Sequence, residues 1–541
     1  MNGRIIVVGA GPVGLTHALL LADAGVPVTV LERATAPGDL PRAISIVDET
    51  FRTMELLGIA DELKAESLTD TGSRYFGRDD RLLAAAKPVP SRIGHPAKTQ
   101  FDQPVMEELL FERALAHPGV DFRLGCTVTD VSQDRDGVSV GYTDVEGRDD
   151  RVEGSWLVGA DGGRSFVRDA LGVKLVGTTQ TQRWIVIDLL NERRSYEKYA
   201  DFHCDGKRPY VLVPGIKGRL RIEYMLFDHE DPDEMTAPEK IRELVRPLRD
   251  PLDPADVRRA TVYVAHQRVA EHYRAGRAFL VGDAAHLMPP FAGQGLNAGI
   301  RDAHNLAWKL VEAARGGASE RLLDSYELER RTHGAKMVKV SRRIGAVVMA
   351  TGGFKTRLRD AIVRVVSILP PVYGFLANMR FITPPDYRDG VAVAPAAGLD
   401  RSLAERVGRA LSQPRVSDAS GGTAGLDAHL GGDWALIAVG APADCFERID
   451  PYWGRIGARL LRLLPRGASI SAAPASVSVP AEPVELIDEE GTIAQPDAGP
   501  YLMAVRPDKY VAAVFRPSEE ATAVAGLRVF IDDRERSGEA G

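Results

Sequence analysis

Three glycines near the N-terminus have the spacing of a phosphate-binding turn. Gly9, Gly11 and Gly14 form the pattern G-x-G-x-x-G between an apolar, strand-like run, Ile5–Val8, and an apolar, helix-like run, Val13 to about Asp23. In this pattern the first glycine permits a tight turn, the second lets the backbone approach a pyrophosphate, and the third lets the helix pack closely on the strand. The free N–H groups and the dipole at the helix start then favour negatively charged phosphates.

A carboxylate follows at the end of the next predicted strand. The β-branched run Val26–Leu31 ends at Glu32, 23 residues after Gly9. An acidic side chain at this point can accept hydrogen bonds from ribose hydroxyl groups. Together, these features predict a dinucleotide-binding βαβ unit, and the alternative is a glycine-rich turn in an ordinary βαβ unit.

Two aspartates later in the chain also follow apolar runs. Asp161 comes directly after Trp156–Gly159 and Ala160, and the pair Gly282-Asp283 follows Arg277–Val281. A carboxylate at a strand end, as at Asp283, can accept hydrogen bonds from ligand hydroxyl groups, whereas the pair Asp161-Gly162 also fits a common turn. A loop with two prolines and two glycines, Pro289–Asn297, then leads into a long helical pattern.

The composition excludes several classes of protein. The chain has 541 residues, 44% of them hydrophobic and 26% charged, as in an ordinary globular protein. The net charge of −7 argues against nucleic acid as the main partner. Three widely separated cysteines, Cys126, Cys204 and Cys445, fit a reducing cytoplasm and predict neither a disulfide framework nor a metal site. No apolar run reaches the roughly 18 residues of a membrane span.

Helices and strands alternate between the glycine turn and Asp161. We expect helices over about Asp48–Leu57 and Val105–Ala116. Three alternating runs, Val120–Leu124, Val128–Ser132 and Val138–Tyr142, are typical of the strands of a meander.

The rest of the chain suggests a second sheet and a further domain. Residues 184–263 consist mostly of strand-like runs such as WIVIDLL and RLRIEYMLF, which predict a sheet inserted before the first domain resumes. Residues 392–432 are rich in Gly, Ala, Ser and Pro, as linkers are. Beyond them we expect strands around helical segments such as Tyr452–Leu464.

Four motifs taken together resemble one enzyme family. They are GAGPVG (9–14), GADGGRSFVR (159–168), GDAAH (282–286) and PPFAGQGLNAGIRDA (289–303). The set is similar to that of the single-component FAD-dependent aromatic hydroxylases, the group that includes p-hydroxybenzoate hydroxylase and phenol hydroxylase. Over essentially the whole chain the sequence resembles one branch, the 3-(3-hydroxyphenyl)propionate hydroxylases, in stretches such as PRAISIVDETFRTM and VRPDKYVAA. It departs from that branch at Val47, where an acid is expected, and at Pro290-Phe291-Ala292, where bulkier residues are expected.

The resemblance implies an α/β fold. We expect a Rossmann-like FAD-binding domain of the p-hydroxybenzoate hydroxylase type, an inserted substrate-domain sheet and a C-terminal thioredoxin-like domain. The predicted boundaries are 1–72, 101–175 and 263–385 for the FAD-binding domain with its following helices, 73–100 and 176–262 for the substrate-binding sheet, and 386–541 for the linker and the C-terminal domain. The last domain contains no C-x-x-C, so we expect no redox role for it.

The resemblance also implies roles for individual residues. Arg42 and Gln103 resemble the family's flavin-contacting arginine and glutamine, and Asp283 would accept hydrogen bonds from the ribityl chain. The helix that begins at Gly295 would direct its positive end at the flavin pyrimidine. His286 would pack and hydrogen-bond rather than catalyse. The predicted FAD-binding residues are Gly9, Gly11, Pro12, Gly14, Glu32, Arg33, Arg42, Gln103, Val128, Asp161, Gly282, Asp283, Pro290, Gly293, Gly295, Leu296 and Asn297. The predicted active-site loop contains Pro289, Pro290, Gly293 and Gln294, and no catalytic acid or base is assigned.

The implied activity is hydroxylation of a phenol. NADH or NADPH would reduce FAD, O2 would be captured as a flavin 4a-hydroperoxide, and the distal oxygen would attack the ring. The implied partners are a small aromatic substrate, O2 and NAD(P)H, and a homodimer is left open. An oxygenase that tailors polyketides or other antibiotics, and a non-catalytic flavin-binding regulator, are the alternatives. A flavin-dependent halogenase is disfavoured because the motif W-x-W-x-I-P is absent.

Overall fold

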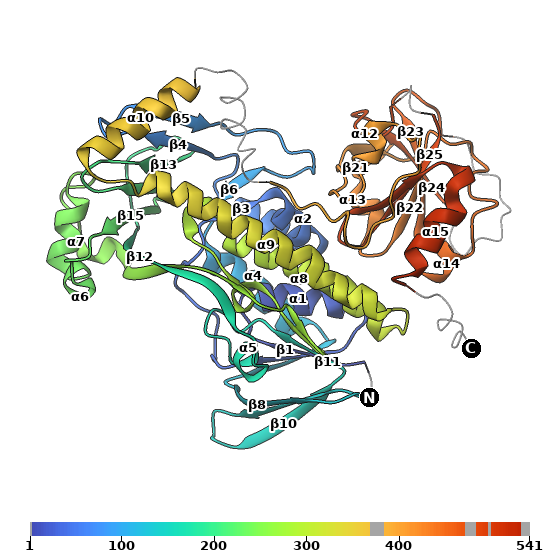
Figure 1. Ribbon diagram of the computed structural model, residues 1–541, viewed down its shortest axis with the longest axis horizontal. Coiled ribbons are helices and arrows are strands. Elements are labelled where there is room, and N and C mark those ends of the chain that lie inside the picture. The colour runs from blue at the N-terminus through green and yellow to red at the C-terminus, as the bar shows by residue number, and fades with distance from the viewer. Residues whose placement is uncertain (1–2, 368–382, 471–482, 496–498, 532–541) are drawn as a thin grey trace.

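The computed structural model describes residues 3–367, 383–470, 483–495 and 499–531, and its central element is a mostly parallel six-stranded sheet (Figure 1). The strand order is β17-β18-β11-β1-β2-β7, in which only the β17–β18 pair is antiparallel. The strands are β1 (Ile5–Val8), β2 (Val28–Glu32), β7 (Val120–Leu124), β11 (Trp156–Gly159), β17 (Arg274–Ala275) and β18 (Ala278–Leu280). Every residue of β1 is buried, as in a parallel sheet that is covered on both faces.

Helix α1 (Pro12–Asp23) completes the predicted βαβ unit. It lies between this sheet and helix α8 (Gly295–Ala314), and residues 14–22 are all buried. This double covering explains why α1 is apolar nearly all round.

The predicted three-strand meander is wrong in its first strand. Strand β7 pairs in parallel with β2, and the meander consists of β8 (Thr127–Gln133), β9 (Val138–Thr143) and β10 (Asp149–Gly154). The alternating pattern of β7 identifies a strand, but its partner depends on the path of the chain beyond it.

A second sheet has eight strands in the order β19-β16-β12-β15-β14-β13-β4-β5. They are β4 (Gly72–Phe76), β5 (Leu82–Ala86), β12 (Leu175–Leu189), β13 (Tyr199–His203), β14 (Tyr210–Pro214), β15 (Leu220–Leu226), β16 (Val257–Ala270) and β19 (His286–Leu287). One face packs against α6 (Pro232–Met235) and α7 (Pro238–Val245) through an apolar cluster that includes Ile222 and Ile241. Two strands from the predicted segment 73–100 thus join those of 176–262, although the domain boundaries themselves remain a prediction.

The C-terminal domain contains a seven-stranded mixed sheet in the order β21-β20-β24-β23-β22-β25-β26. Its strands are β20 (Arg415–Ser417), β21 (Thr423–Gly425), β22 (Ala435–Val439), β23 (Arg459–Pro465), β24 (Val484–Asp488), β25 (Tyr501–Val505) and β26 (Val511–Phe515). Parallel β22, β23 and β24 continue into antiparallel β25 and β26, as expected of a thioredoxin-like sheet.

Two expectations for this part of the chain are wrong. The segment Tyr452–Leu464 is helical only in α14 (Tyr452–Arg455), and strand β23 follows. The leucine pairs of β23 fit the helical period, but an inner strand is buried on both faces and accommodates the same pattern. The presumed linker 392–432 contains α12 (Arg401–Ala404), α13 (Asp427–Leu430), β20 and β21.

The predicted helices near Asp48 and Val105 are confirmed as α2 (Asp48–Leu56) and α4 (Gln103–Ala116). Further helices within the described ranges are α3 (Ala60–Ala65), α5 (Phe166–Ala170), α9 (Glu320–Val348), α10 (Gly353–Ser367) and α15 (Glu520–Arg528), and a short ladder joins β3 (Ser45–Val47) to β6 (Lys98–Gln100). In the part of the chain that the structure describes, no helix combines the length and the apolar character that crossing a bilayer requires.

Buried ion pairs attach the C-terminal domain, drawn in orange and red in Figure 1, to the rest of the protein. Glu329 of α9 accepts from Arg506 Nη1 at 2.7 Å and from Lys309 Nζ at 2.8 Å. Arg52 of α2 pairs with both carboxylate oxygens of Asp427. These five side chains are all less than 10% exposed, so the domain is docked by contacts from which water is excluded.

Candidate active site

One cavity of about 840 Å³ is lined by residues of both large sheets. Its size is near the upper end of the range of about 300–1,000 Å³ that is usual for ligand pockets. Its wall contains most of the predicted site residues, namely Gly9, Gly11, Pro12, Glu32, Arg33, Arg42, Gln103, Val128, Asp161, Gly282, Asp283, Pro290, Gly293, Gln294, Gly295 and Leu296. Gly14, Pro289 and Asn297 are not part of the wall.

The glycine turn is shaped by close backbone contacts. Gly9 has a φ of +102°, and a Cβ there would lie 2.5 Å from the carbonyl oxygen of Ala160. A Cβ on Gly14 would lie 2.0 Å from the carbonyl oxygen of Gly9, whereas a Cβ on Gly11 would meet nothing within 4 Å. Gly11 therefore leaves the start of α1, which has no side-chain cap, open to the cavity.

Glu32 is fixed over this turn by the backbone. Its Oε2 accepts from Ala10 N at 2.7 Å, and its Oε1 accepts from Ala34 N at 2.8 Å. Each carboxylate oxygen can accept a further hydrogen bond. The carboxylate is therefore held in place while it can still accept from a ligand hydroxyl group.

The segment that precedes β3 is held by two side chains from distant elements. Arg221 of β15 donates to the carbonyl oxygens of Arg42 at 2.7 Å and Pro41 at 2.9 Å. Gln103, at the start of α4, accepts from Ala43 N at 2.6 Å. The amide of Gln103 is thus used in holding this segment, and the exposed side chain of Arg42 lines the cavity.

Asn297 connects the same region to the start of α8. Its Oδ1 accepts from Val47 N at 3.0 Å and from Thr50 Oγ1 at 2.7 Å. Its Nδ2 donates to the carbonyl oxygens of Ser45 at 3.1 Å and Gly293 at 2.7 Å. Protein groups therefore satisfy the whole side-chain amide, which leaves only the backbone of Asn297 for a ligand.

The loop before α8 brings backbone and an aromatic ring to the cavity. Gly293 has a φ of +59°, and α8 begins at Gly295 without a side-chain cap. Phe291 packs edge-on against Trp184, with ring centroids 5.4 Å apart. The loop is thus anchored on the eight-stranded sheet while the first N–H groups of α8 remain free of helical partners.

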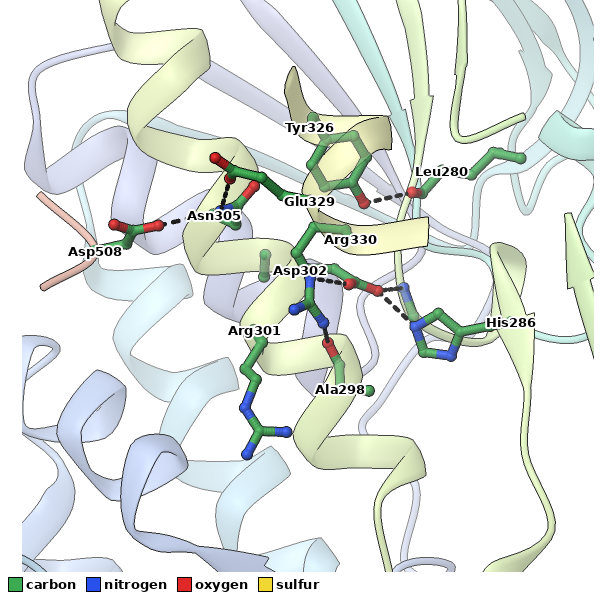
Figure 2. A network of polar contacts seen from close by, with 12 residues as sticks. Leu280, His286, Ala298, Arg301, Asp302, Asn305, Tyr326, Glu329, Arg330 and Asp508 are labelled. Atoms are coloured by element: carbon green, nitrogen blue, oxygen red, sulfur yellow. Dashed lines mark hydrogen bonds and ion pairs between the residues drawn. The ribbon is translucent and has the colours of Figure 1, made fainter. Parts of the chain in front are cut away.

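A buried polar network supports the turn that contains Asp283 (Figure 2). Asp302 Oδ2 accepts from Gly282 N at 3.0 Å and lies 2.7 Å from His286 Nε2, while Oδ1 accepts from Arg330 Nε at 2.7 Å. The side chains of His286, Asp302 and Arg330 are fully buried. His286 therefore positions this turn from behind the cavity wall and does not face a ligand.

Asp161 is also engaged by its own neighbours. Its carboxylate accepts from Ser165 Oγ and from Val167 N, the latter at 3.0 Å. These bonds hold the start of α5, so Asp161 shapes the wall while its oxygens are partly occupied.

The cavity contains polar side chains that the sequence analysis did not single out. They include Ser73, Lys98, Arg221, Glu223 and Arg259. The signal lies in the alternation of β15, in which Leu220, Ile222 and Tyr224 pack towards α7 while Arg221 and Glu223 alternate with them and face the cavity. Charged residues at alternate positions of an inner strand indicate a polar face that a ligand site can use.

Removal from bulk water disfavours charge in this cavity. Desolvation by the surrounding protein raises the pKa of Asp283, although His286 and Arg42 oppose the rise; the residue is exposed and lines the cavity. Burial likewise raises the pKa of Glu223, whose Oε2 accepts from the Tyr263 hydroxyl at 3.3 Å.

The wall fits FAD. A turn without side chains at a helix N-terminus suits a pyrophosphate, a fixed carboxylate at a strand end suits a ribose, and a second helix start suits the electron-rich ring. The cavity also extends past these features to the polar face of the eight-stranded sheet, which leaves space for a second ligand.

Comparisons with known proteins also indicate an FAD-binding protein. Residues 3–341 match the family described as FAD binding domain, and residues 408–529 match the HcaD C-terminal domain. The 3-(3-hydroxy-phenyl)propionate/3-hydroxycinnamic acid hydroxylase of Comamonas testosteroni is 33% identical over 564 residues, with 96% of this chain and 95% of the relative covered. The enzyme of the same name from Burkholderia cenocepacia (strain HI2424) is 35% identical over 531 residues, with 97% and 96% covered.

Solved structures show the same fold over the whole length. The flavin-dependent monooxygenase PieE, in complex with FAD and substrate, matches with a TM-score of 0.79 and 24% identity, covering 97% of this chain and 99% of its own. The anhydrotetracycline hydroxylase OxyS from Streptomyces rimosus matches with a TM-score of 0.74 and 26% identity over the same shares. The protein is thus an FAD-dependent monooxygenase that uses a reduced nicotinamide, O2 and an aromatic substrate. This chain belongs to the FAD binding domain family, among the flavin-dependent aromatic hydroxylases.

Proposed function

We propose that the enzyme hydroxylates a phenol that bears a short acidic side chain, such as 3-(3-hydroxyphenyl)propionate, beside the existing hydroxyl group. The names of its relatives support this substrate class. The observation that carries the proposal is the continuity of the cavity from the glycine turn to the polar face of the eight-stranded sheet. A cofactor held at one end can therefore meet a charged aromatic substrate at the other.

Within this proposal the residues that bind FAD act by position. The backbone at Gly11 faces the pyrophosphate, Glu32 accepts from the adenosine ribose, and Asp283 accepts from the ribityl hydroxyl groups. The N–H group of Leu296 at the start of α8 faces the flavin pyrimidine, where a helix terminus stabilises negative charge by about 0.3–1 kcal/mol and by up to about 2 kcal/mol in a partly buried site. When bound, FAD supplies the activation of O2 and the transfer of one oxygen atom to the ring.

The remaining roles in this proposal are structural. Gly14 packs α1 on β1, Asn297 positions the turn at Gly293, and Pro289 supports the active-site loop from behind the wall.

The protein's part in the reaction is to hold the ring and exclude water. Tyr75 and Phe202, stacked with centroids 4.8 Å apart, lie in the cavity wall with Val211, Phe291 and Ile344. This apolar surface favours an aromatic ring over water, and exclusion of water protects reactive oxygen species from wasteful release. Glu223, which accepts from the Tyr263 hydroxyl group, is a wall carboxylate that can accept a proton from the substrate hydroxyl group.

A polycyclic aromatic substrate is the second candidate. OxyS and an aklavinone-11 hydroxylase share the backbone of this chain over 97% of its length, with TM-scores of 0.74 and 0.75. The two candidates share the reaction and differ only in the size and charge of the substrate.

A panel assay tests the proposal. NADH or NADPH oxidation is measured with 3-(3-hydroxyphenyl)propionate, with phenol and with a polycyclic aromatic polyketide, and hydroxylated product and hydrogen peroxide are quantified. We expect the acid to accelerate oxidation and to appear as a catechol with little peroxide. If only the polycycle does both, the second candidate replaces the first.

Oligomeric state and cellular location stay predictions. A mass in solution of twice the chain mass of 58.6 kDa would support the homodimer.

A further inference from the structure

Lys98 is a cation in the cavity wall with no carboxylate beside it among the described residues. It lies on β6, and its cross-strand neighbour on β3 is Val47, which offers no charge. Its Nζ donates to Ser73 Oγ at 2.6 Å and to the Gly72 carbonyl oxygen at 3.4 Å. An enclosed ammonium without a counter-ion is unfavourable, so stability alone does not explain this lysine.

Ser73 adds a second hydrogen-bond donor at the same point. It lies in the cavity wall, accepts from Lys98 and, within the ranges that the structure describes, donates its hydroxyl proton to no acceptor. The ammonium has three N–H groups, of which two are used. One free N–H and one free O–H thus stand side by side and match the two oxygens of a carboxylate, whereas a phenol presents only one oxygen.

The surroundings of this pair suit an aromatic acid. Ser73 is the cross-strand neighbour of Ala200, and Tyr75 is that of Phe202, so the two donors adjoin an apolar wall. Arg221, another cation of this wall, is by contrast paired with Asp188 at 2.6 Å. The site therefore combines an apolar surface with a positive charge, that of Lys98, which no carboxylate pairs with among the described residues.

We propose that Lys98 and Ser73 bind the carboxylate of the aromatic substrate and so select phenolic acids over neutral phenols. This inference rests on the proposed function and names the residues that set its substrate class.

The pH dependence follows from the enclosure of Lys98. Burial lowers the pKa of its ammonium to about 8. The charge is therefore mostly present at pH 7 and is lost as the pH rises through 8. Arginine at this position would stay charged over the whole range.

The test measures kcat/KM of wild type, Lys98→Met and Lys98→Arg with two substrates. One is the acid 3-(3-hydroxyphenyl)propionate, and the other is the uncharged amide of the same shape, 3-(3-hydroxyphenyl)propionamide. Loss of a hydrogen-bonded charge should lower kcat/KM for the acid by about 10- to 150-fold in Lys98→Met and leave the amide nearly unchanged. The exposed Lys207, changed to Met, is the matched control and should alter neither substrate. FAD titration of each variant reports whether the cofactor site is intact.

The pH profile provides the second readout, because kcat/KM follows the free enzyme. In wild type the ratio of kcat/KM for acid to that for amide should fall above about pH 8. In Lys98→Arg it should stay level. If Lys98→Met no longer binds FAD, the comparison of pH profiles between wild type and Lys98→Arg tests the role of Lys98 by itself.

Failure of the inference can be told from failure of the proposed function. If wild type hydroxylates the acid but Lys98→Met affects acid and amide equally, or neither, the assignment of Lys98 is wrong and the proposed function stands. If the ratio of kcat/KM for the acid to that for the amide stays constant above pH 8 in wild type, the assignment of Lys98 is likewise wrong. If wild type hydroxylates only neutral phenols or polycycles, the proposed substrate class fails and the assignment falls with it.

Discussion

Asp302→Asn should strongly destabilise the protein, although Asp302 does not line the cavity. Its carboxylate is the only one within ion-pair distance of Arg330 among the described residues, and the other partners of Arg330 are the Tyr387 hydroxyl at 2.7 Å and the Ala298 carbonyl at 3.1 Å. Asparagine has nearly the same shape but no charge, so it leaves a fully buried guanidinium uncompensated. Breaking such a pair costs about 3–5 kcal/mol. That is a large part of a typical stability of about 5–15 kcal/mol.

Urea unfolding of the FAD-free protein, followed by circular dichroism, measures the effect. The matched control is Asp324→Asn, because Asp324 pairs with Arg274 while 68% of its own side chain is exposed, and exposed pairs contribute little. The variant should also bind FAD more weakly, since Asp302 holds the Gly282 N–H of the turn that presents Asp283. Equal unfolding midpoints for Asp302→Asn and Asp324→Asn would refute the reasoning.

Acidification provides an independent check. Burial acts to raise the pKa of Asp302, but its neighbours Arg330 and His286 hold it below its ordinary value. The stabilisation by the carboxylate is therefore complete above the unfolded-state pKa of about 4 and is lost as the pH falls through the lower folded-state pKa. The gap in midpoint between wild type and Asp302→Asn should narrow below about pH 4.

Three further outcomes are expected. Heat or acid should release FAD rather than FMN, because the glycine turn and Glu32 suit a pyrophosphate and a second ribose; chromatography of the released cofactor decides. Asp283→Ala should weaken FAD binding by about 10- to 150-fold in a fluorescence titration, and an unchanged dissociation constant would disprove its role. Cys445→Ser should preserve turnover, because burial raises the pKa of this free thiol to about 11 and keeps it protonated, and a large fall in turnover of a folded variant would contradict this.

The residues proposed to bind FAD could be singled out from the sequence because the features that mark them are local. The Gly9–Gly14 turn, Glu32 at the end of β2 and the Gly282-Asp283 pair each lie where a strand ends, and parallel strands bring such ends to one edge of the sheet. All of them line one cavity. Resemblance to a known family added Arg42 and Gln103, which no periodicity singles out.

Strand pairing was harder to predict. The prediction of a helix over β23 was wrong because a short apolar run can fit a helix or a buried strand equally well. The assignment of β7 to the meander was wrong because such a run does not specify which strand it pairs with.

The residues proposed to meet the substrate are brought together only by the tertiary structure. Lys98 and Ser73 are 25 residues apart, Arg221 and Pro41 are 180 apart, and Asn297 and Val47 are 250 apart, yet each pair is joined by a hydrogen bond. Arg221, Glu223 and Arg259 face the cavity because of the register of the eight-stranded sheet, and Lys98 faces it because of the separate β3–β6 ladder, since a shift of one residue turns every side chain of a strand to the opposite face. The sequence by itself thus determined which cofactor the protein uses, whereas the pairing of distant strands determined which charged side chains line the proposed substrate pocket.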